Sequence, residues 1–160
     1  AEVVGDSVEE MLEMADDYIE IGPNITIKVP LTPEGLKVCK ELSDDDVAVN
    51  VTLCFSTAQA ILAAKAGAAY VSPFVGRVYD QSFDGLKLIE EITDVYATHK
   101  QKTEVLAASI RDVHQVASCF RVGADICTIP SKIFSGMYKH VLTDQGIAKF
   151  DEDWTKLVGG

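Results

Sequence analysis

Lys28 lies in the middle of an apolar, strand-like run and is the side chain of this chain best placed to do chemistry. Segment 24–30 reads NITIKVP, and its β-branched residues are typical of a buried strand. Burial disfavours a charged amine and can lower the pKa of a lysine from about 10.4 to about 7–8. A neutral amine can form a Schiff base with a carbonyl substrate. The alternative is an edge-strand lysine that blocks aggregation.

Polar side chains occupy one face of several other strand-like runs. This alternation helps to decide between a reactive lysine and an edge-strand lysine. Successive side chains of a strand point to opposite faces. The polar face is predicted to carry Thr26 and Lys28, then Asn50 and Thr52, then Ser72 and Phe74, and finally Ser109 and Arg111, the last two opposite Leu106 and Ala108. A doubly wound sheet is apolar on both faces, whereas a barrel turns one face inward, with polar groups near its C-terminal mouth. The pattern favours a barrel wall, and hydrogen-bonded core groups are the alternative.

Strand-like and helix-like segments alternate about six times along the chain. Strands are predicted at 1–4, 25–30, 47–55, 69–75, 103–110 and 125–130. Helices are predicted after N-caps at Ser7, Thr32 and Ser56, and over 85–97, 113–122, 132–140 and 146–157. Repeated βα units predict an α/β fold with a parallel sheet. No linker or composition shift interrupts residues 1–160, which we expect to form a single domain.

The composition of the chain argues against several classes of binding partner. The formal charge of −11 over 160 residues argues against a nucleic-acid surface and against attraction to anionic lipid. No apolar stretch approaches the roughly 18 residues of a membrane span, so we expect a cytoplasmic protein. The four cysteines lack C-x-x-C spacing and are predicted to be reduced core thiols. The three histidines lie in separate helical contexts, and no metal site is expected.

Several ordered motifs resemble the transaldolase family, in particular its small subfamily, which includes the fructose-6-phosphate aldolases. The motifs are IKVP at 27–30, NVT at 50–52, YVSPFVGR at 70–77, AASIR at 107–111 and FDEDW at 150–154. The resemblance implies a (β/α)8 TIM-barrel enzyme that transfers a dihydroxyacetone unit between sugar phosphates of the fructose 6-phosphate, erythrose 4-phosphate and sedoheptulose 7-phosphate class. It implies no cofactor.

The resemblance also implies catalytic roles. Lys28 would form the Schiff base, and Glu2 aligns with the family's acid/base glutamate. Thr52 resembles the residue that orients the catalytic water, and Asn50 resembles the partner of the lysine and of substrate hydroxyls. Ser72 would line the same cavity. For these small polar residues, hydrogen bonding within the barrel is the alternative, and Glu2 alone would pass for a solvated terminal residue.

A site that binds a sugar phosphate needs positively charged side chains to balance the phosphate dianion. Guanidinium groups bind such a dianion with bidentate geometry. Arg77 and Arg111 follow two strands, and Ser109 lies two residues before Arg111. We expect these three residues to bind the phosphate, although each arginine alone could be an ordinary surface residue. The aldolases that resemble this chain carry glutamine at the position of Glu2 and tyrosine at that of Phe74, so the residues present here favour transaldolase over aldolase.

The match begins at what would be the family's third strand. The first two βα units, with an aspartate and a Thr-Thr-Asn-Pro segment that help to bind substrate, have no counterpart in this sequence. Six βα units cannot close an eight-stranded barrel, so we expect completion by oligomerisation, swapping or another chain. The alternatives are a remodelled oligomer and a catalytically impaired assembly module. The amphipathic segment 147–157 could dock on a neighbouring subunit or pack on its own barrel.

Overall fold

Five parallel strands and eight helices make up the computed structural model, which describes residues 1–159. The strands are β1 (Ile27–Pro30), β2 (Val49–Cys54), β3 (Tyr70–Pro73), β4 (Glu104–Ala107) and β5 (Ile126–Cys127). The helices are α1 (Val8–Ile19), α2 (Pro33–Asp44), α3 (Thr57–Lys65), α4 (Val75–Asp80), α5 (Gly85–Thr98), α6 (Val113–Arg121), α7 (Ser131–Gly136) and α8 (Val141–Val158).

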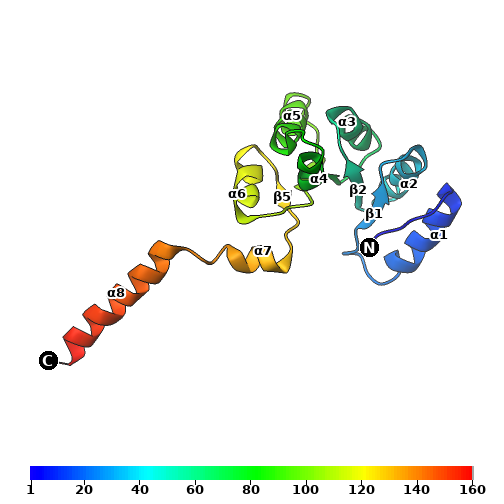
Figure 1. Ribbon diagram of the computed structural model, residues 1–160. Helices are drawn as coiled ribbons and strands as arrows, with labels where there is room; N and C mark the ends of the chain where they lie inside the picture. The colour runs from blue at the N-terminus through cyan, green and yellow to red at the C-terminus, as the bar shows by residue number, and fades with distance from the viewer. Residues whose placement is uncertain (160) are drawn as a thin grey trace.

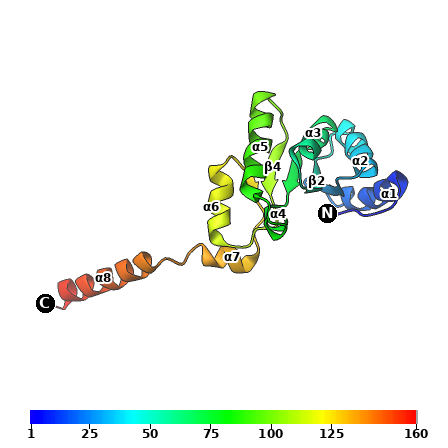
Figure 2. The ribbon, with the colours of Figure 1, turned by 45° about the horizontal axis from the view of Figure 1, so that its top comes forward.

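The strand order separates the two candidate α/β architectures. The order in the sheet is β1-β2-β3-β4-β5, and every neighbouring pair is parallel. A doubly wound sheet reverses its order at a switch point, whereas right-handed crossovers that always advance in one direction place their helices on one face. Figures 1 and 2 show α2, α3, α5 and α6 in an arc outside the strands. Within residues 1–159 the sheet is open, and its one-directional order is consistent with part of a barrel.

The core lies between the strands and this arc of helices. The side chains that alternate toward the helices are fully buried, as with Ile27 and Val29 on β1 and Val49 and Val51 on β2. Between them stand the partly exposed Lys28 and the other polar residues. The predicted alternation is therefore present in β1 and in the first part of β2, and it is interrupted at Leu53, which has a φ of 60° and is 36% exposed.

Local signals fix the helix boundaries. Each of the predicted N-caps at Ser7, Thr32 and Ser56 accepts a backbone N–H three residues on through its side chain. The N–H groups of a first helical turn lack partners within the helix, and such caps satisfy them. Gly67 and Gly123 follow α3 and α6 with positive φ angles of 90° and 101°, so these helices end where a residue without Cβ is favoured.

Three expectations about the elements differ from the structure. Residues 1–4 form a single parallel bridge, between Glu2 and Lys28, in place of a full strand. Helix α4 begins at Val75, the last residue of a segment predicted as strand, and was not predicted. Its N-cap residue Phe74 makes no side-chain hydrogen bond, so the sequence carries no capping signal for this helix. Ser109 has a φ of 60°, and this conformation changes the direction in which side chains point after β4. As a result Leu106 and Ala108 line the same cavity as Ser109, and the predicted parity of this run is wrong.

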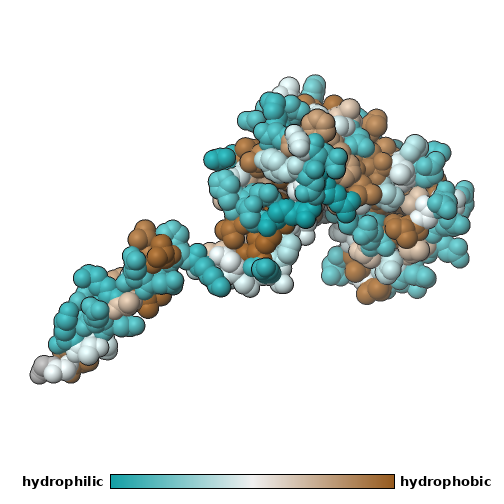
Figure 3. All heavy atoms as spheres, viewed as in Figure 1, coloured by the Kyte–Doolittle hydropathy of each residue, from teal (hydrophilic) through white to brown (hydrophobic). Residues whose placement is uncertain are grey.

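Helix α8 projects away from the rest of the molecule in both views (Figures 1 and 2). None of its residues is buried, and Phe150 and Trp154 are 74% and 65% exposed. Figure 3 shows apolar side chains along it. The alternative that segment 147–157 packs on its own barrel is therefore wrong for the chain as described.

The four cysteines are free, and Cys39, Cys54 and Cys119 are buried. Burial raises the pKa of the Cys39 and Cys54 thiols to about 11, in keeping with inert core residues. None of the helices in residues 1–159 is long and apolar enough to cross a membrane.

Candidate active site

The Lys28 amine has a carboxylate as its immediate partner. Nζ of Lys28 donates a hydrogen bond of 3.1 Å to Oε2 of Glu2. The backbone aligns the two residues, because Val3 N–H donates to the Lys28 carbonyl at 2.9 Å and Lys28 N–H donates to the Ala1 carbonyl at 2.6 Å. The single bridge between residues 1–3 and β1 thus brings Glu2 to the lysine.

The surroundings of Lys28 are more polar than the apolar run suggested. Its side chain is 32% exposed and that of Glu2 is 51% exposed. Ile27 and Val29, which flank it in sequence, point to the helices and are fully buried. The expectation of an amine enclosed by apolar groups is therefore wrong, and a carboxylate that can accept a proton stands in contact with it instead.

Asn50 is the neighbour of Lys28 on the next strand. The two residues are paired in the register of β1 and β2, and their side chains alternate onto the same face. Oδ1 of Asn50 accepts a hydrogen bond of 2.8 Å from the hydroxyl of Ser72, which is buried on β3. This bond leaves the amide NH₂ of Asn50 as the group with donors to offer inside the cavity.

Thr52 carries an unpaired polar atom. Its side chain is 1% exposed, and its Oγ1 has no hydrogen-bond partner among the described residues. A buried hydroxyl without a partner costs free energy, and such a group at a cavity wall is a natural contact for a ligand or a water molecule. Thr52 lines the cavity that contains Lys28.

One cavity of about 270 Å³ gathers five of the eight predicted site residues. It is lined by Lys28, Asn50, Thr52, Ser72, Phe74, Leu106, Ala108, Ser109 and Thr128. These residues come from β1 to β4 and the turns that follow β3, β4 and β5, so the cavity lies toward the carboxyl ends of the parallel strands. In barrels of parallel strands this is the end that carries active sites.

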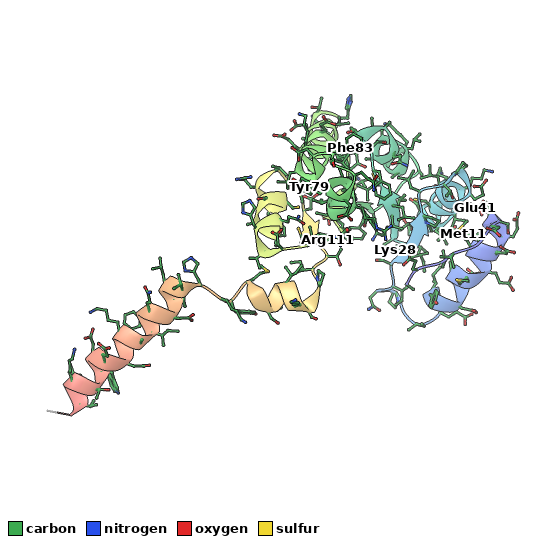
Figure 4. The ribbon with its side chains drawn as sticks, viewed as in Figure 1. Met11, Lys28, Glu41, Tyr79, Phe83 and Arg111 are labelled. Atoms are coloured by element: carbon green, nitrogen blue, oxygen red, sulfur yellow. The ribbon has the colours of Figure 1, made fainter. Side chains whose placement is uncertain are left out.

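The two predicted phosphate-binding arginines share a second cavity of about 560 Å³. Its walls are Phe55, Arg77, Val78, Asp80, Gln81, Phe83 and Arg111. Arg111 donates through Nη2 to Oδ2 of Asp80 at 2.7 Å. Figure 4 shows Lys28 and Arg111 both on the inner side of the arc of helices. Ser109 lies on the wall of the Lys28 cavity rather than in this one.

Phe74 relates the Lys28 cavity to a residue of the arginine cavity. It lines the cavity of Lys28, and the guanidinium carbon of Arg77 lies 4.8 Å from the centroid of its ring. A cation over an aromatic face is attracted by the ring quadrupole, so this contact holds Arg77 beside the ring. The arrangement places a cationic cavity next to the amine cavity with one aromatic side chain between them.

Sequence reasoning missed the apolar wall, Leu106 and Ala108, and the hydroxyl of Thr128. Thr128 directly follows β5, and its position after a strand end was the available signal. Asp80 was also missed, because it belongs to helix α4, which was not predicted from the sequence. A larger cavity of about 640 Å³ contains Thr103 and Asp125 just before β4 and β5, at the opposite end of the strands, and none of the predicted site residues.

This fold and site define an α/β protein with a parallel sheet and with a lysine–carboxylate pair beside a cavity toward the carboxyl ends of its strands. The family model for transaldolase/fructose-6-phosphate aldolase matches residues 1–160. Proteins named probable transaldolase from Cereibacter sphaeroides and Paracoccus denitrificans are 54% and 50% identical over 156 residues. These alignments cover 98% of this chain, 71% of the first relative and 72% of the second. The chain belongs to the transaldolase/fructose-6-phosphate aldolase family, which confirms the resemblance seen in its sequence.

Solved structures add information about the fold alone. A mandelate oxidase structure matches with a TM-score of 0.62 at 15% identity, covering 80% of this chain and 48% of its own. The chain therefore spans less than half the length of that enzyme. The arrangement of strands and helices seen here recurs in a protein of very different sequence.

Proposed function

We propose that this chain carries the active site of a transaldolase, which transfers a dihydroxyacetone unit between sugar phosphates through a Schiff base on Lys28. The observation that carries the proposal is the 3.1 Å contact between Nζ of Lys28 and the Glu2 carboxylate, beside the cavity formed with Asn50, Thr52 and Ser72. Membership of the family supports it.

Formation of the Schiff base begins with a proton transfer. A protonated amine is no nucleophile, so Lys28 passes a proton to the Glu2 carboxylate, and the neutral nitrogen adds to the ketose carbonyl. The resulting carbinolamine loses its hydroxyl as water when Glu2 returns a proton to that oxygen, either directly or through a water molecule. The product is a protonated imine between Lys28 and the sugar.

The protonated imine withdraws electrons and so allows the nearby carbon–carbon bond of the sugar to break. A base removes the proton of the hydroxyl on the far carbon of the bond that breaks, so that this carbon becomes an aldehyde, and the electron pair of the bond moves into the imine to give an enamine. The aldehyde formed leaves, and a second aldehyde accepts the enamine in the reverse sequence. Glu2 acts as the base through a water that the hydroxyl of Thr52 orients, and the Asn50 amide and Ser72 hold substrate hydroxyls.

The phosphate end of the sugar belongs in the neighbouring cavity. Arg77 and Arg111 supply two guanidinium groups there, and Ser109 contributes a hydroxyl from the wall of the Lys28 cavity. A sugar phosphate is an extended molecule with a carbonyl near one end and a dianion at the other. Two adjoining cavities, one with an amine and one with two arginines, match these two ends.

Cleavage in the manner of a fructose-6-phosphate aldolase is the second candidate reaction, because the family includes both activities. The resemblance that assigns glutamine and tyrosine to aldolases at the positions of Glu2 and Phe74 favours transfer for this chain. If the enamine is protonated rather than passed on, water hydrolyses the resulting imine and free dihydroxyacetone leaves Lys28, so the ratio of release to transfer separates the two reactions.

Assembly with another chain is part of the proposal. The strands described here leave β5 paired on one side only, and α8 presents Phe150 and Trp154 to solvent. An unpaired strand edge and an exposed amphipathic helix both gain by pairing with a second chain. We propose a homo-oligomer in which these surfaces are covered; a catalytically impaired assembly module is the remaining candidate.

Borohydride trapping tests the catalytic proposal directly. The folded protein is incubated with fructose 6-phosphate, reduced, digested and analysed by mass spectrometry. We expect a dihydroxyacetone adduct at Lys28 and none in Lys28→Met, with Lys40→Met as a matched control that keeps the adduct. Absence of an adduct at Lys28 in folded protein would refute the Schiff-base reading and favour the assembly module. Transfer to erythrose 4-phosphate is then compared with release of dihydroxyacetone, and predominant release would assign the aldolase reaction.

A further inference from the structure

Asp80 is an acidic residue in the cavity proposed for a phosphate dianion. Its Oδ2 accepts a hydrogen bond of 2.7 Å from Nη2 of Arg111. Both side chains are half exposed, at 56% and 55%. A carboxylate at this place repels a dianion, so its presence beside a phosphate-binding arginine needs a physical reason.

The path of the Arg111 side chain is set by one face of helix α4. Gly76 and Asp80 are four residues apart and therefore lie on the same face. A Cβ added to Gly76 would lie 2.6 Å from Nε and 2.9 Å from Cγ of Arg111. The arginine stem thus crosses α4 where Gly76 leaves room, and its head reaches Asp80 one turn further on.

The ion pair leaves the guanidinium with donors to spare. A guanidinium has five N–H groups, and the hydrogen bond to Asp80 uses one of them. An arginine without a fixed partner loses rotamer freedom when it binds a ligand, and a pre-oriented one loses less. Arg77 is held in a comparable way, by the ring of Phe74.

We propose that Asp80 is a positioning residue, which holds the guanidinium of Arg111 toward the cavity that it shares with Arg77 and so selects for phosphorylated substrates. The inference rests on the proposed function, since it takes Arg77 and Arg111 as the phosphate-binding pair. Asp80 acts through Arg111 and does not touch the substrate.

Two substitutions separate positioning from charge. Asp80→Ala removes both the acceptor and the negative charge, whereas Asp80→Asn removes the charge and keeps an amide oxygen for Arg111. If Asp80 only repels the dianion, both variants bind phosphate more tightly. If it positions Arg111, the alanine variant binds phosphate more weakly and the asparagine variant recovers most of the affinity. Asp17→Ala, an exposed residue of α1, is the control for a lost surface charge.

The measurements are calorimetric titration with inorganic phosphate, which requires no turnover, and steady-state kinetics with fructose 6-phosphate and with unphosphorylated fructose. Loss of pre-organisation should weaken phosphate binding and raise KM for fructose 6-phosphate about tenfold in Asp80→Ala, with kcat within about twofold. Asp80→Asn should stay within about threefold of the unsubstituted protein, because its acceptor remains. Kinetics with fructose should not change.

Unchanged or tighter phosphate binding in Asp80→Ala would overturn the positioning role and leave the phosphate site standing. If the unsubstituted protein binds no phosphate while Lys28 is still trapped by borohydride, the assignment of Arg77 and Arg111 fails, and the role of Asp80 fails with it. The Schiff-base proposal survives that outcome, so the two failures are distinguishable.

Discussion

Nζ of Lys28 lies 3.1 Å from Oε2 of Glu2, although the two residues are 26 positions apart in the chain. A parallel bridge between their backbones sets this distance. The Lys28 amine therefore owes its carboxylate partner to residues that precede helix α1, and the polar groups around it to β2 and β3.

Glu2→Gln tests the acid/base role. The amide keeps the size of the side chain and a hydrogen-bond acceptor for Lys28, but it cannot take up a proton. Loss of general acid/base catalysis should lower kcat by about 10²–10⁴-fold, with little change in the free energy of unfolding. Steady-state transfer kinetics and urea unfolding measure the two quantities. Glu9→Gln on α1 is the matched control, and an equal loss in both variants would contradict the role of Glu2.

The two buried threonines Thr52 and Thr103 make a matched pair. The hydroxyl of Thr103 donates to the Ala68 carbonyl at 2.7 Å, whereas that of Thr52 has no partner among the described residues. Thr103→Val should therefore destabilise the fold by about 1–2 kcal/mol, and Thr52→Val should not. If Thr52 orients the catalytic water, its valine variant should lose about tenfold or more in kcat. A stable, fully active Thr52→Val enzyme would exclude that role.

Much of this site could be predicted from alternation along the strands. Lys28, Asn50, Thr52 and Ser72 fall on one face by parity alone, and parallel pairing brings them to one cavity. The alternation is interrupted at Leu53 and at Ser109, where positive φ angles of 60° change which side chains face inward. Such a backbone conformation in a residue other than glycine has no reliable sequence signal.

The ion pairs and the short helix α4 lay beyond sequence reasoning for a different reason. Whether Glu2 is a solvated terminal residue or the partner of Lys28 depends on a contact across 26 residues, which periodicity does not encode. Helix α4 has six residues and no side-chain cap, so neither length nor capping distinguishes it from a turn. The sequence pattern of α8 predicts a helix, but it does not specify how this helix is oriented relative to the rest of the chain.

Gly76→Ala should disrupt the arginine cavity. A Cβ at this position would lie 2.1 Å from the Ser109 carbonyl oxygen and 2.6 Å from Nε of Arg111, so the turn after β4 must shift. We expect weaker binding of inorganic phosphate and a higher KM for fructose 6-phosphate, measured by calorimetry and kinetics.

Gly146→Ala is the matched control for Gly76→Ala. Gly146 lies inside α8, and nothing stands within 4 Å of an added Cβ. Since alanine favours a helix over glycine by about 1 kcal/mol, this variant should leave phosphate binding unchanged and raise helix content slightly. If both variants bind phosphate normally, the close approach of Gly76 to Arg111 is not required for the site.

Stability should fall at alkaline pH. Burial raises the pKa of the Cys39 and Cys54 thiols from about 9 to about 11, and it also raises the pKa of Tyr96, whose hydroxyl donates to the Ala60 carbonyl. The unfolded chain releases these protons at lower pH than the folded chain. The free energy of unfolding should therefore decrease as the pH rises from about 9 to about 11.

Urea unfolding at a series of pH values measures this slope. Cys54→Ala should show a shallower decrease than the unsubstituted protein, because one of the titrating groups is gone, whatever its stability at neutral pH. Ser118→Ala, which removes a buried side chain that does not titrate in this range, should keep the original slope. Equal slopes in all three proteins would contradict the role of the buried thiols.

The order of the sheet also bears on how the chain folds. Each strand pairs with the strand of the next βα unit, so every unit finds its partner immediately upstream or downstream. A chain that emerges from the ribosome can then add one unit at a time to an edge that already exists, without waiting for distant segments. Glu2 and Lys28 precede Arg77, Ser109 and Arg111 along the chain, so the lysine–carboxylate pair can form before the residues proposed to bind phosphate are added to the sheet.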